Sequence, residues 1–333
     1  MIGDVENGFH TYVTREIPAT GLRLLLEHGS VETWQGDVSP PREEFLARVA
    51  ESHALLCLLT DRVDAEVLDA GKRLKVVSAY AVGVDNIDVA AATERGIAVC
   101  NTPDVLTDAT ADLAWALLLA AARRIPESDR FVRDGRWVSW GPQLMLGQPI
   151  ARRTLGIVGI GRIGQAMARR ARGFDMTILY TGRRPNPEAE KSLGVRFVDL
   201  DTLLRESDFV SLHAPLTPET RGLIGRAQLA VMKPTAILVN TARGPVVDQA
   251  ALTEALRERK IFAAGLDVFT IEPIPHNDPL LSLPNVVVAP HIGSADVPTR
   301  EEMARLAAQA IVDVMAGQKP AHLVNPDVWD HRR

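Results

Sequence analysis

Short apolar runs rich in branched side chains alternate along the chain with longer segments of helical spacing, and this alternation constrains the fold more than any other sequence feature. It is typical of β-α-β units, in which crossover helices join parallel strands. The pattern therefore predicts an α/β protein. One series of expected strands covers residues 10–15, 31–34, 54–59, 74–80 and 98–101, and a second covers 154–160, 176–181, 209–213, 236–241, 263–268 and 286–290.

The two series predict two doubly wound domains, each built on its own parallel sheet. The length of 333 residues agrees with this division, because a typical domain has about 150 residues. Between the series, residues 106–124 form an expected helix rich in Ala and Leu with almost no polar face, so it must be packed on most sides. Residues 299–317 read as a further amphipathic helix.

Composition and charge exclude several classes of protein. With 46% hydrophobic and 24% charged residues, the chain can build a sizeable core. The 37 basic residues against 42 acidic ones give a net charge of -5, so no basic field exists to hold nucleic acid or an anionic membrane. Cys57 and Cys100 are too few for a disulfide framework, and the His and acidic residues show no metal-ligand spacing. An acidic start and the lack of a long apolar span predict a cytoplasmic protein.

A glycine-rich segment, Gly159-Ile160-Gly161-Arg162-Ile163-Gly164, follows the expected strand at 154–158 and opens a helical stretch. In this context the glycines allow a tight turn, close approach of the backbone to a pyrophosphate, and close packing of helix on strand. The segment predicts a dinucleotide site that includes Arg162 and Ile163. A plain glycine turn is the alternative.

The end of the next expected strand indicates which dinucleotide is bound. An acid about 20 residues after the glycine motif normally binds the ribose hydroxyls. Residues 178–184 contain no acid, and Arg183 and Arg184 follow a small Thr-Gly pair instead. Two guanidinium groups suit a 2′-phosphate, so the sequence predicts NADPH in preference to NADH. The alternative is that both arginines are solvated loop charges.

Five motifs stand in order along nearly the whole chain: Val82-Gly83-Val84-Asp85-Asn86-Ile87-Asp88, the segment from Gly159 to Gly164, Asn240-Thr241-Ala242-Arg243-Gly244, Gly265-Leu266-Asp267-Val268 with Glu272-Pro273, and Pro290-His291-Ile292-Gly293-Ser294-Ala295. On these motifs the chain resembles the D-isomer-specific 2-hydroxyacid dehydrogenases. Within that family, residues 53–61, 102–108, 179–183 and 276–281 are most similar to glyoxylate/hydroxypyruvate reductases.

The resemblance implies a Rossmann-type coenzyme domain inserted in a flavodoxin-like substrate domain. We therefore expect the substrate-binding domain at residues 1–103 and 290–333, with the dinucleotide-binding domain at 104–289. The implied reaction is the reduction of glyoxylate to glycolate and of hydroxypyruvate to D-glycerate.

The resemblance also implies that Arg243, Glu272 and His291 are catalytic. A 2-oxoacid must be held by its carboxylate, and its carbonyl oxygen must be polarised and then protonated as hydride arrives. Arg243 offers a planar fork for both oxygens. His291 is suited to donate the proton, and a carboxylate partner, Glu272, favours its protonated form.

Further site residues come from the same resemblance. The backbone N–H groups of Val82 and Gly83 are expected to bind the substrate carboxylate, with Ser294 as a secondary contact. Trp140, in a polar arm bounded by Pro142, is expected to reach from one subunit into the active site of its partner, and an aromatic interface anchor is the alternative. Both imply a homodimer built by the helix at 106–124 and this arm. Residues expected to line the dinucleotide are Pro215, Thr241, Asp267 and Gly293.

Two other functions stay open on the sequence. A 2-ketogluconate reductase or another D-2-hydroxyacid dehydrogenase would carry the same motifs, because these do not decide how long a substrate the site admits. A dinucleotide-sensing corepressor would share the fold without rapid turnover.

Overall fold

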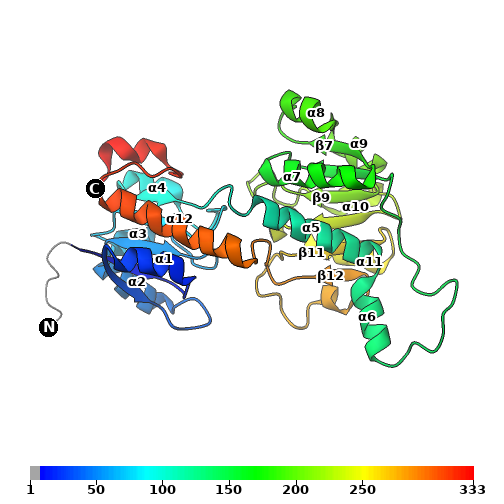
Figure 1. Cartoon of the computed structure of the whole chain (residues 1–333), viewed down its shortest axis with the longest axis horizontal. Coiled ribbons are helices and arrows are strands. Elements are labelled where there is room, and N and C mark those ends of the chain that lie inside the picture. Colours follow the sequence, from blue (N-terminus) through cyan, green and yellow to red (C-terminus); the bar gives the residue numbers. More distant parts are fainter. Residues whose placement is uncertain (1–7) are drawn as a thin grey trace. The chain divides into compact units, whose positions relative to one another are not determined.

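The computed structural model describes residues 8–333 and divides into two compact units (Figure 1). Unit 1 is the chain up to Leu106 together with Ala295–Arg333, and unit 2 is Thr107–Ser294. The domain boundaries expected from the sequence lie after residues 103 and 289. Each unit holds one fully parallel sheet with helices on both faces, which confirms the predicted α/β fold. The acidic start at residues 1–7 lies outside the described residues.

The sheet of unit 1 has the strand order β2-β1-β3-β4-β5, the flavodoxin-like order of a doubly wound fold. Its chain order reverses between β1 and β3, so the carboxyl ends of these strands flank the switch point. The strands are β1 (Phe9–Val13), β2 (Gly29–Thr33), β3 (Ala54–Cys57), β4 (Val76–Ala79) and β5 (Ala98–Cys100).

Two hydrophobic layers cover the faces of this sheet. One layer includes α1 and α12, which lie side by side (Figure 1), and the other includes α2, α3 and α4. Asp296 caps α12, because its side chain accepts a hydrogen bond from the Thr299 N–H at 2.7 Å. The helices are α1 (Ala19–Leu26), α2 (Arg42–Glu51), α3 (Ala65–Ala70), α4 (Val89–Glu94) and α12 (Val297–Met315), with a 3-10 turn η4 at Pro326–His331.

The sheet of unit 2 has the order β12-β11-β10-β9-β6-β7-β8. Read from its first strand, β6, the chain moves outward through β7 and β8, then returns to β9 on the other side of β6, as in a Rossmann fold. Ligands bind such sheets beyond the carboxyl ends of the strands at this reversal. The strands are β6 (Thr154–Val158), β7 (Thr177–Thr181), β8 (Arg196–Phe197), β9 (Phe209–Leu212), β10 (Ile237–Asn240), β11 (Ala263–Leu266) and β12 (Val286–Val288).

Helix α5 (Thr107–Ala122) packs on β10, β11 and β12 and against α7, which is why its sequence has almost no polar face. A close approach allows this packing, since a Cβ on Gly265 would lie 2.9 Å from the Cβ of Leu117. The other helices of unit 2 are α6 (Ile125–Arg133), α7 (Arg162–Ala171), α8 (Pro187–Leu193), α9 (Leu200–Glu206), α10 (Arg226–Val231) and α11 (Gln249–Arg257), with 3-10 turns η1 (Arg172–Phe174), η2 (Gly244–Val246) and η3 (Pro279–Ser282).

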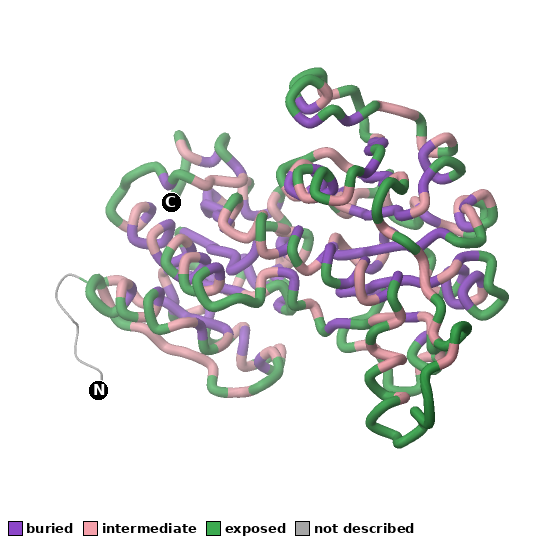
Figure 2. Tube along the Cα trace, turned by 45° about the vertical axis from the view of Figure 1, so that its right-hand side comes forward, coloured by how far each residue is buried: buried purple, intermediate pink, exposed green. Residues whose placement is uncertain are grey.

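Burial follows the strands in both units, and the segment after α6 stays at the surface (Figure 2). β3, β4, β9, β10 and β11 are buried at every residue, as expected for parallel strands covered on both faces. Among residues 8–333, no helix combines the length and apolar character that crossing a membrane requires.

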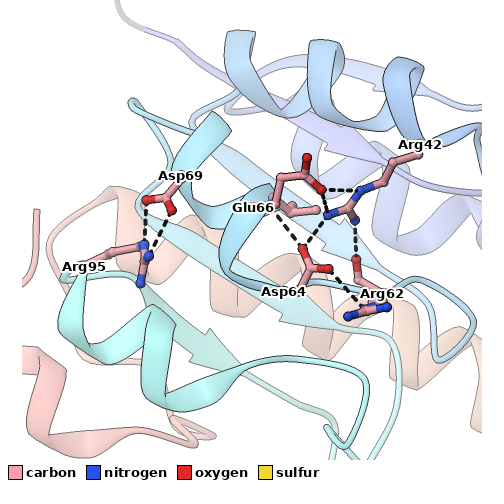
Figure 3. Close-up of polar contacts among 7 residues, drawn as sticks. Arg42, Arg62, Asp64, Glu66, Asp69 and Arg95 are labelled. Atoms are coloured by element: carbon pink, nitrogen blue, oxygen red, sulfur yellow. Dashed lines mark hydrogen bonds and ion pairs between the residues drawn. The ribbon is translucent and has the colours of Figure 1, made fainter.

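Ion pairs join the short helices of unit 1 (Figure 3). Arg42 contacts both Asp64, the N-cap of α3, and Glu66. Arg95 binds Asp69 through two hydrogen bonds of 2.9 and 3.0 Å. Exposed pairs of this kind contribute about 0–1 kcal/mol each, so they fasten α2, α3 and α4 at the surface rather than hold the core.

Candidate active site

The glycine-rich loop lies between β6 and α7, at the reversal of the unit 2 sheet. Gly159 has a φ of +97°, and a Cβ there would come within 2.9 Å of the backbone of His213 and Ala214. A Cβ on Gly164 would lie 2.1 Å from the carbonyl oxygen of Gly159. Gly161 differs, because a Cβ there would meet nothing within 4 Å. Two glycines are thus needed by the fold, and Gly161 leaves open space at the start of α7.

That space fits a pyrophosphate, and two glycine variants test it. We expect Gly161→Ala to keep the wild-type melting temperature but to lower dinucleotide affinity by about tenfold or more, because the added methyl group takes the room of the phosphates. Gly164→Ala should instead lower the melting temperature, and Gly173→Ala, also in open space but away from the loop, should change neither. Calorimetric titration with NADPH and thermal unfolding measure both. Full affinity in Gly161→Ala would contradict the assignment.

Arg183 and Arg184 lie in the exposed loop that follows β7. Within residues 8–333, neither guanidinium group makes a hydrogen bond or ion pair. The charge of Arg183 contributes to lowering the pKa of Glu219, after larger effects of hydrogen bonds to that carboxylate. The two guanidinium groups are therefore accessible to an anionic ligand.

His291 and Glu272 lie together beyond the carboxyl ends of the strands of unit 2. The Nδ1 atom of His291 is 2.7 Å from Oε2 of Glu272, and Oε1 of Glu272 accepts a hydrogen bond of 2.9 Å from the Phe269 N–H. His291 has a φ of +55°, and its N–H donates to the carbonyl of Asp267 at 2.9 Å. A left-handed backbone is uncommon at a non-glycine residue.

The charge state of Glu272 follows from its contacts. Burial raises the pKa of this carboxyl group, but the hydrogen bond from His291, the Phe269 N–H and the charge of Arg243 together bring the pKa below its ordinary value. Glu272 is therefore a carboxylate at neutral pH and accepts a hydrogen bond from Nδ1 of His291. His213 contrasts with this, since desolvation lowers its pKa to about 4 and its Nε2 lies 2.9 Å from the Ser211 hydroxyl. His213 is neutral and cannot serve as the acid.

Arg243 follows β10 in a turn that the neighbouring residues hold. The side chain of Asn240 donates to the Arg243 carbonyl at 2.9 Å and accepts from the Ala242 N–H at 3.0 Å. Gly244 allows a close approach, because a Cβ there would lie 1.9 Å from the Phe269 backbone. This approach brings the turn of Arg243 against the segment whose N–H binds Glu272, so the three predicted catalytic residues belong to one assembly within unit 2.

Two buried polar atoms near this assembly have no hydrogen-bond partner in the described part of the chain: Oγ1 of Thr241 and Oδ2 of Asp267. Buried polar atoms are normally hydrogen-bonded, so a polar ligand that forms hydrogen bonds with these two atoms would fit here. Burial raises the pKa of Asp267, whose Oδ1 accepts from the Ile292 N–H at 2.7 Å. A Cβ on Gly293 would lie 3.3 Å from Asp267 Oδ2, so a larger residue there would crowd the same place. With the open space at Gly161, these residues fit a bound dinucleotide.

The remaining predicted residues are distributed over both units. In unit 1, Val82 and Gly83 follow β4, and Val82 is 36% exposed. In unit 2, Pro215 follows β9, and Ser294 is partly buried with contacts of its own. Trp140 is 78% exposed in the segment after α6.

Sequence reasoning missed two residues that hold the site. Asn240 was quoted only as part of a motif, although a buried Asn at a strand end is a signal for a structured turn. Gln249 was not singled out. Its side chain accepts from the Thr270 N–H at 3.0 Å and donates to Asp278 at 2.8 Å, which holds the loop that carries Glu272.

A cavity of about 190 Å³ opens at the other end of the unit 2 sheet, where β11 and β12 begin, and contains none of the catalytic candidates. The cavity is lined by Ala121, Arg124, Pro126, Glu127, Arg259, Phe262, Ala263, Pro284, Asn285, Val286 and Val287.

Among residues 8–333, no three His, Cys, Asp or Glu side chains are placed to hold a metal ion.

Comparison with known proteins places the chain in a family. The family model of the D-isomer specific 2-hydroxyacid dehydrogenase NAD-binding domain matches residues 115–293. A glyoxylate reductase of Korarchaeum cryptofilum is 55% identical over 318 residues, covering 95% of this chain and 96% of the relative. A glyoxylate reductase of Thermococcus onnurineus is 54% identical over 325 residues, covering 96% and 97%.

Solved structures give the same result. A protein of Thermus thermophilus superposes with a TM-score of 0.90 at 50% identity, covering 95% of this chain and 99% of that one. An NADPH-dependent glyoxylate/hydroxypyruvate reductase of Sinorhizobium meliloti, solved with NADP and malonate, has a TM-score of 0.84 at 32% identity and covers 97% and 98%. The fold, the glycine loop and the paired His291 and Glu272 thus stand in a chain that belongs to the D-isomer-specific 2-hydroxyacid dehydrogenase family and is an NAD(P)-dependent dehydrogenase.

Proposed function

We propose that this chain reduces glyoxylate to glycolate and hydroxypyruvate to D-glycerate, with NADPH as the preferred cofactor and His291 as the proton donor. The observation that carries the proposal is the 2.7 Å contact between His291 Nδ1 and Glu272 Oε2, in the unit that also holds Arg243 and the glycine loop. The curated relatives named glyoxylate reductase support 2-oxoacid reductase activity.

The chemistry divides between the cofactor and the side chains. A bound reduced nicotinamide supplies the hydride that the carbonyl carbon accepts. Arg243 binds the oxoacid carboxylate and polarises the carbonyl oxygen. Glu272 holds His291 through Nδ1, so Nε2 is the atom that gives its proton to the developing alkoxide. Val82, Gly83 and Ser294 are proposed as further substrate contacts on the family resemblance.

Arg183 and Arg184 are proposed to bind the 2′-phosphate of NADPH. Support comes from their exposure, from the lack of an acid in the loop, and from the structural neighbour described as NADPH-dependent. Arg162, Ile163 and the α7 N-terminus are proposed to bind the pyrophosphate. NADH is the weaker cofactor in this proposal. Pro215, Thr241, Asp267 and Gly293 are proposed to line the rest of the dinucleotide.

Neutralising both loop arginines tests the cofactor preference. In Arg183→Gln with Arg184→Gln, we expect the ratio of kcat/KM for NADPH over NADH to fall by about tenfold or more, because two charge-assisted contacts are lost. The kcat/KM for NADH should stay near the wild-type value. Arg172→Gln, which removes an exposed arginine contact to the Ser192 carbonyl, is the matched control. An unchanged ratio in the double variant would show that the phosphate is held elsewhere.

The experiment that tests the proposed function follows the loss of reduced-nicotinamide absorbance with glyoxylate, hydroxypyruvate and 2-ketogluconate, each with NADPH and NADH. Fast turnover of the first two with NADPH is the expected result. Fast turnover of 2-ketogluconate alone would favour the longer substrate. Tight cofactor binding without turnover of any oxoacid would favour a dinucleotide sensor.

A cytoplasmic homodimer is part of the proposal. The arm after α6 exposes Trp137 to 58% and Trp140 to 78%, and α6 itself buries no residue. A second copy of the chain, covering α5, α6 and this arm, is the occupant that the family resemblance implies, with Trp140 at the substrate of the partner. Neither nucleic acid nor a membrane is expected as a partner, given the net charge of -5.

A further inference from the structure

The loop that carries Arg183 and Arg184 has no side-chain contact to orient either guanidinium group within residues 8–333. Its members from Gly182 to Pro185 are all exposed. The direction of the two arginines therefore depends on how the backbone is anchored on each side of the loop.

Two backbone anchors fix the loop. On the near side, the Gly159 N–H donates to the Thr181 carbonyl at 2.9 Å, which joins the glycine loop to the end of β7. On the far side, the Asn186 N–H donates to the hydroxyl of Tyr180 at 2.7 Å. The phenol of Tyr180, the second-last residue of β7, thus binds the backbone of the residue just after the loop.

The Tyr180 hydroxyl is itself held. It donates to Oε1 of Glu190 at 2.9 Å, while its ring is fully buried and lies edge-on to Phe197 at 5.4 Å between centroids. Asn186 caps α8 by accepting from the Ala189 N–H at 3.1 Å. Desolvation and the Glu190 carboxylate raise the pKa of Tyr180, against the effect of the Asn186 N–H, so the hydroxyl remains a donor at neutral pH.

We propose that Tyr180, with Glu190 and Asn186, is a positioning device that presets the loop of Arg183 and Arg184 for a 2′-phosphate and so contributes to cofactor specificity. This inference rests on the proposed NADPH preference. Packing alone does not require the hydroxyl, since a phenylalanine would fill the same buried space. The hydroxyl contacts reach across the exposed loop to Asn186 and to Glu190 of α8, and a preset loop loses less entropy when it binds an anion.

The test uses the intact protein and two probes that differ only in the phosphate, 2′,5′-ADP and 5′-ADP, titrated by calorimetry. In Tyr180→Phe we expect the affinity for 2′,5′-ADP to fall by about tenfold and that for 5′-ADP to hold. In the same variant, the KM for NADPH should rise relative to the KM for NADH. Tyr12→Phe is the matched control, because Tyr12 is also a buried strand tyrosine but its hydroxyl has no partner in the described chain.

If Tyr180→Phe does not fold, variants of Glu190 test the same inference. Glu190→Gln keeps an acceptor oxygen and should retain the 2′,5′-ADP affinity, whereas Glu190→Ala should lose part of it. Equal losses for both probes in Tyr180→Phe would show a merely structural role, and no loss for either would also overturn the inference. A wild-type protein that binds the two probes equally would instead overturn the proposed NADPH preference itself.

Discussion

Replacing His291 with alanine is expected to lower kcat by about 10²- to 10⁴-fold, the usual contribution of a positioned general acid. Affinity for NADPH should stay near the wild-type value, because the hydrogen bond from His291 to Asp267, a proposed dinucleotide residue, uses the backbone N–H, which alanine keeps. The expectation follows from the contact of Nδ1 with Glu272, which commits one ring nitrogen and leaves Nε2 to carry the transferred proton. Steady-state rates with glyoxylate and calorimetric titration with NADPH measure the two effects.

Two companion variants separate proton donation from damage to the fold. Glu272→Gln removes the carboxylate that holds Nδ1 of His291, so we expect kcat with glyoxylate to fall while NADPH affinity stays near wild type. His28→Ala, which changes an exposed histidine bonded to the Leu24 carbonyl, should leave both unchanged. Wild-type turnover in His291→Ala would remove this residue from the mechanism.

The fold was predictable because parallel strands buried on both faces read as continuous apolar runs. Most runs extended past the strand ends, although the run at 176–181 ends with β7 at Thr181. Predicted strands continued to residues 160, 268 and 290, whereas β6, β11 and β12 end at Val158, Leu266 and Val288. Val268, two residues beyond the end of β11, is still buried. An apolar pattern reports burial, not backbone pairing, and it missed β8, which has only two residues.

The site, like the fold, was only partly predictable from the sequence. The family resemblance implied that His291 and Glu272 are partners, and the structure places them in contact. The reason that Arg243 joins them could not be deduced, because it depends on the backbone of Gly244 approaching Phe269, a contact between two different strand ends. The hydrogen bond between the Asn186 N–H and the Tyr180 hydroxyl could not be deduced from the sequence either. A tyrosine in an apolar run predicts a core residue, and only coordinates show that its hydroxyl binds across a loop.

Replacing Arg243 with alanine should reduce kcat by about 10²- to 10³-fold and raise the KM for glyoxylate, because the variant loses both the carboxylate contact and a donor to the developing oxyanion. The turn itself should survive. Within the turn, the variant loses the hydrogen bond of 2.9 Å from Arg243 Nη1 to the Ala242 carbonyl. Asn240 still holds the turn through the Arg243 carbonyl and the Ala242 N–H, and Gly244 packs through its backbone. NADPH affinity and melting temperature are therefore expected to stay near wild type.

The conservative variant and chemical rescue make this assignment sharp. Arg243→Lys keeps the charge but lacks the planar fork, so it should recover only part of the lost kcat/KM. Guanidinium ion added at a concentration that does not unfold the protein should restore part of the rate of Arg243→Ala and none of the rate of His291→Ala. If Arg243→Lys matched wild type, charge alone would suffice and the two-oxygen contact would be wrong. If rescue were equal in both alanine variants, the guanidinium would act outside the place that Arg243 leaves.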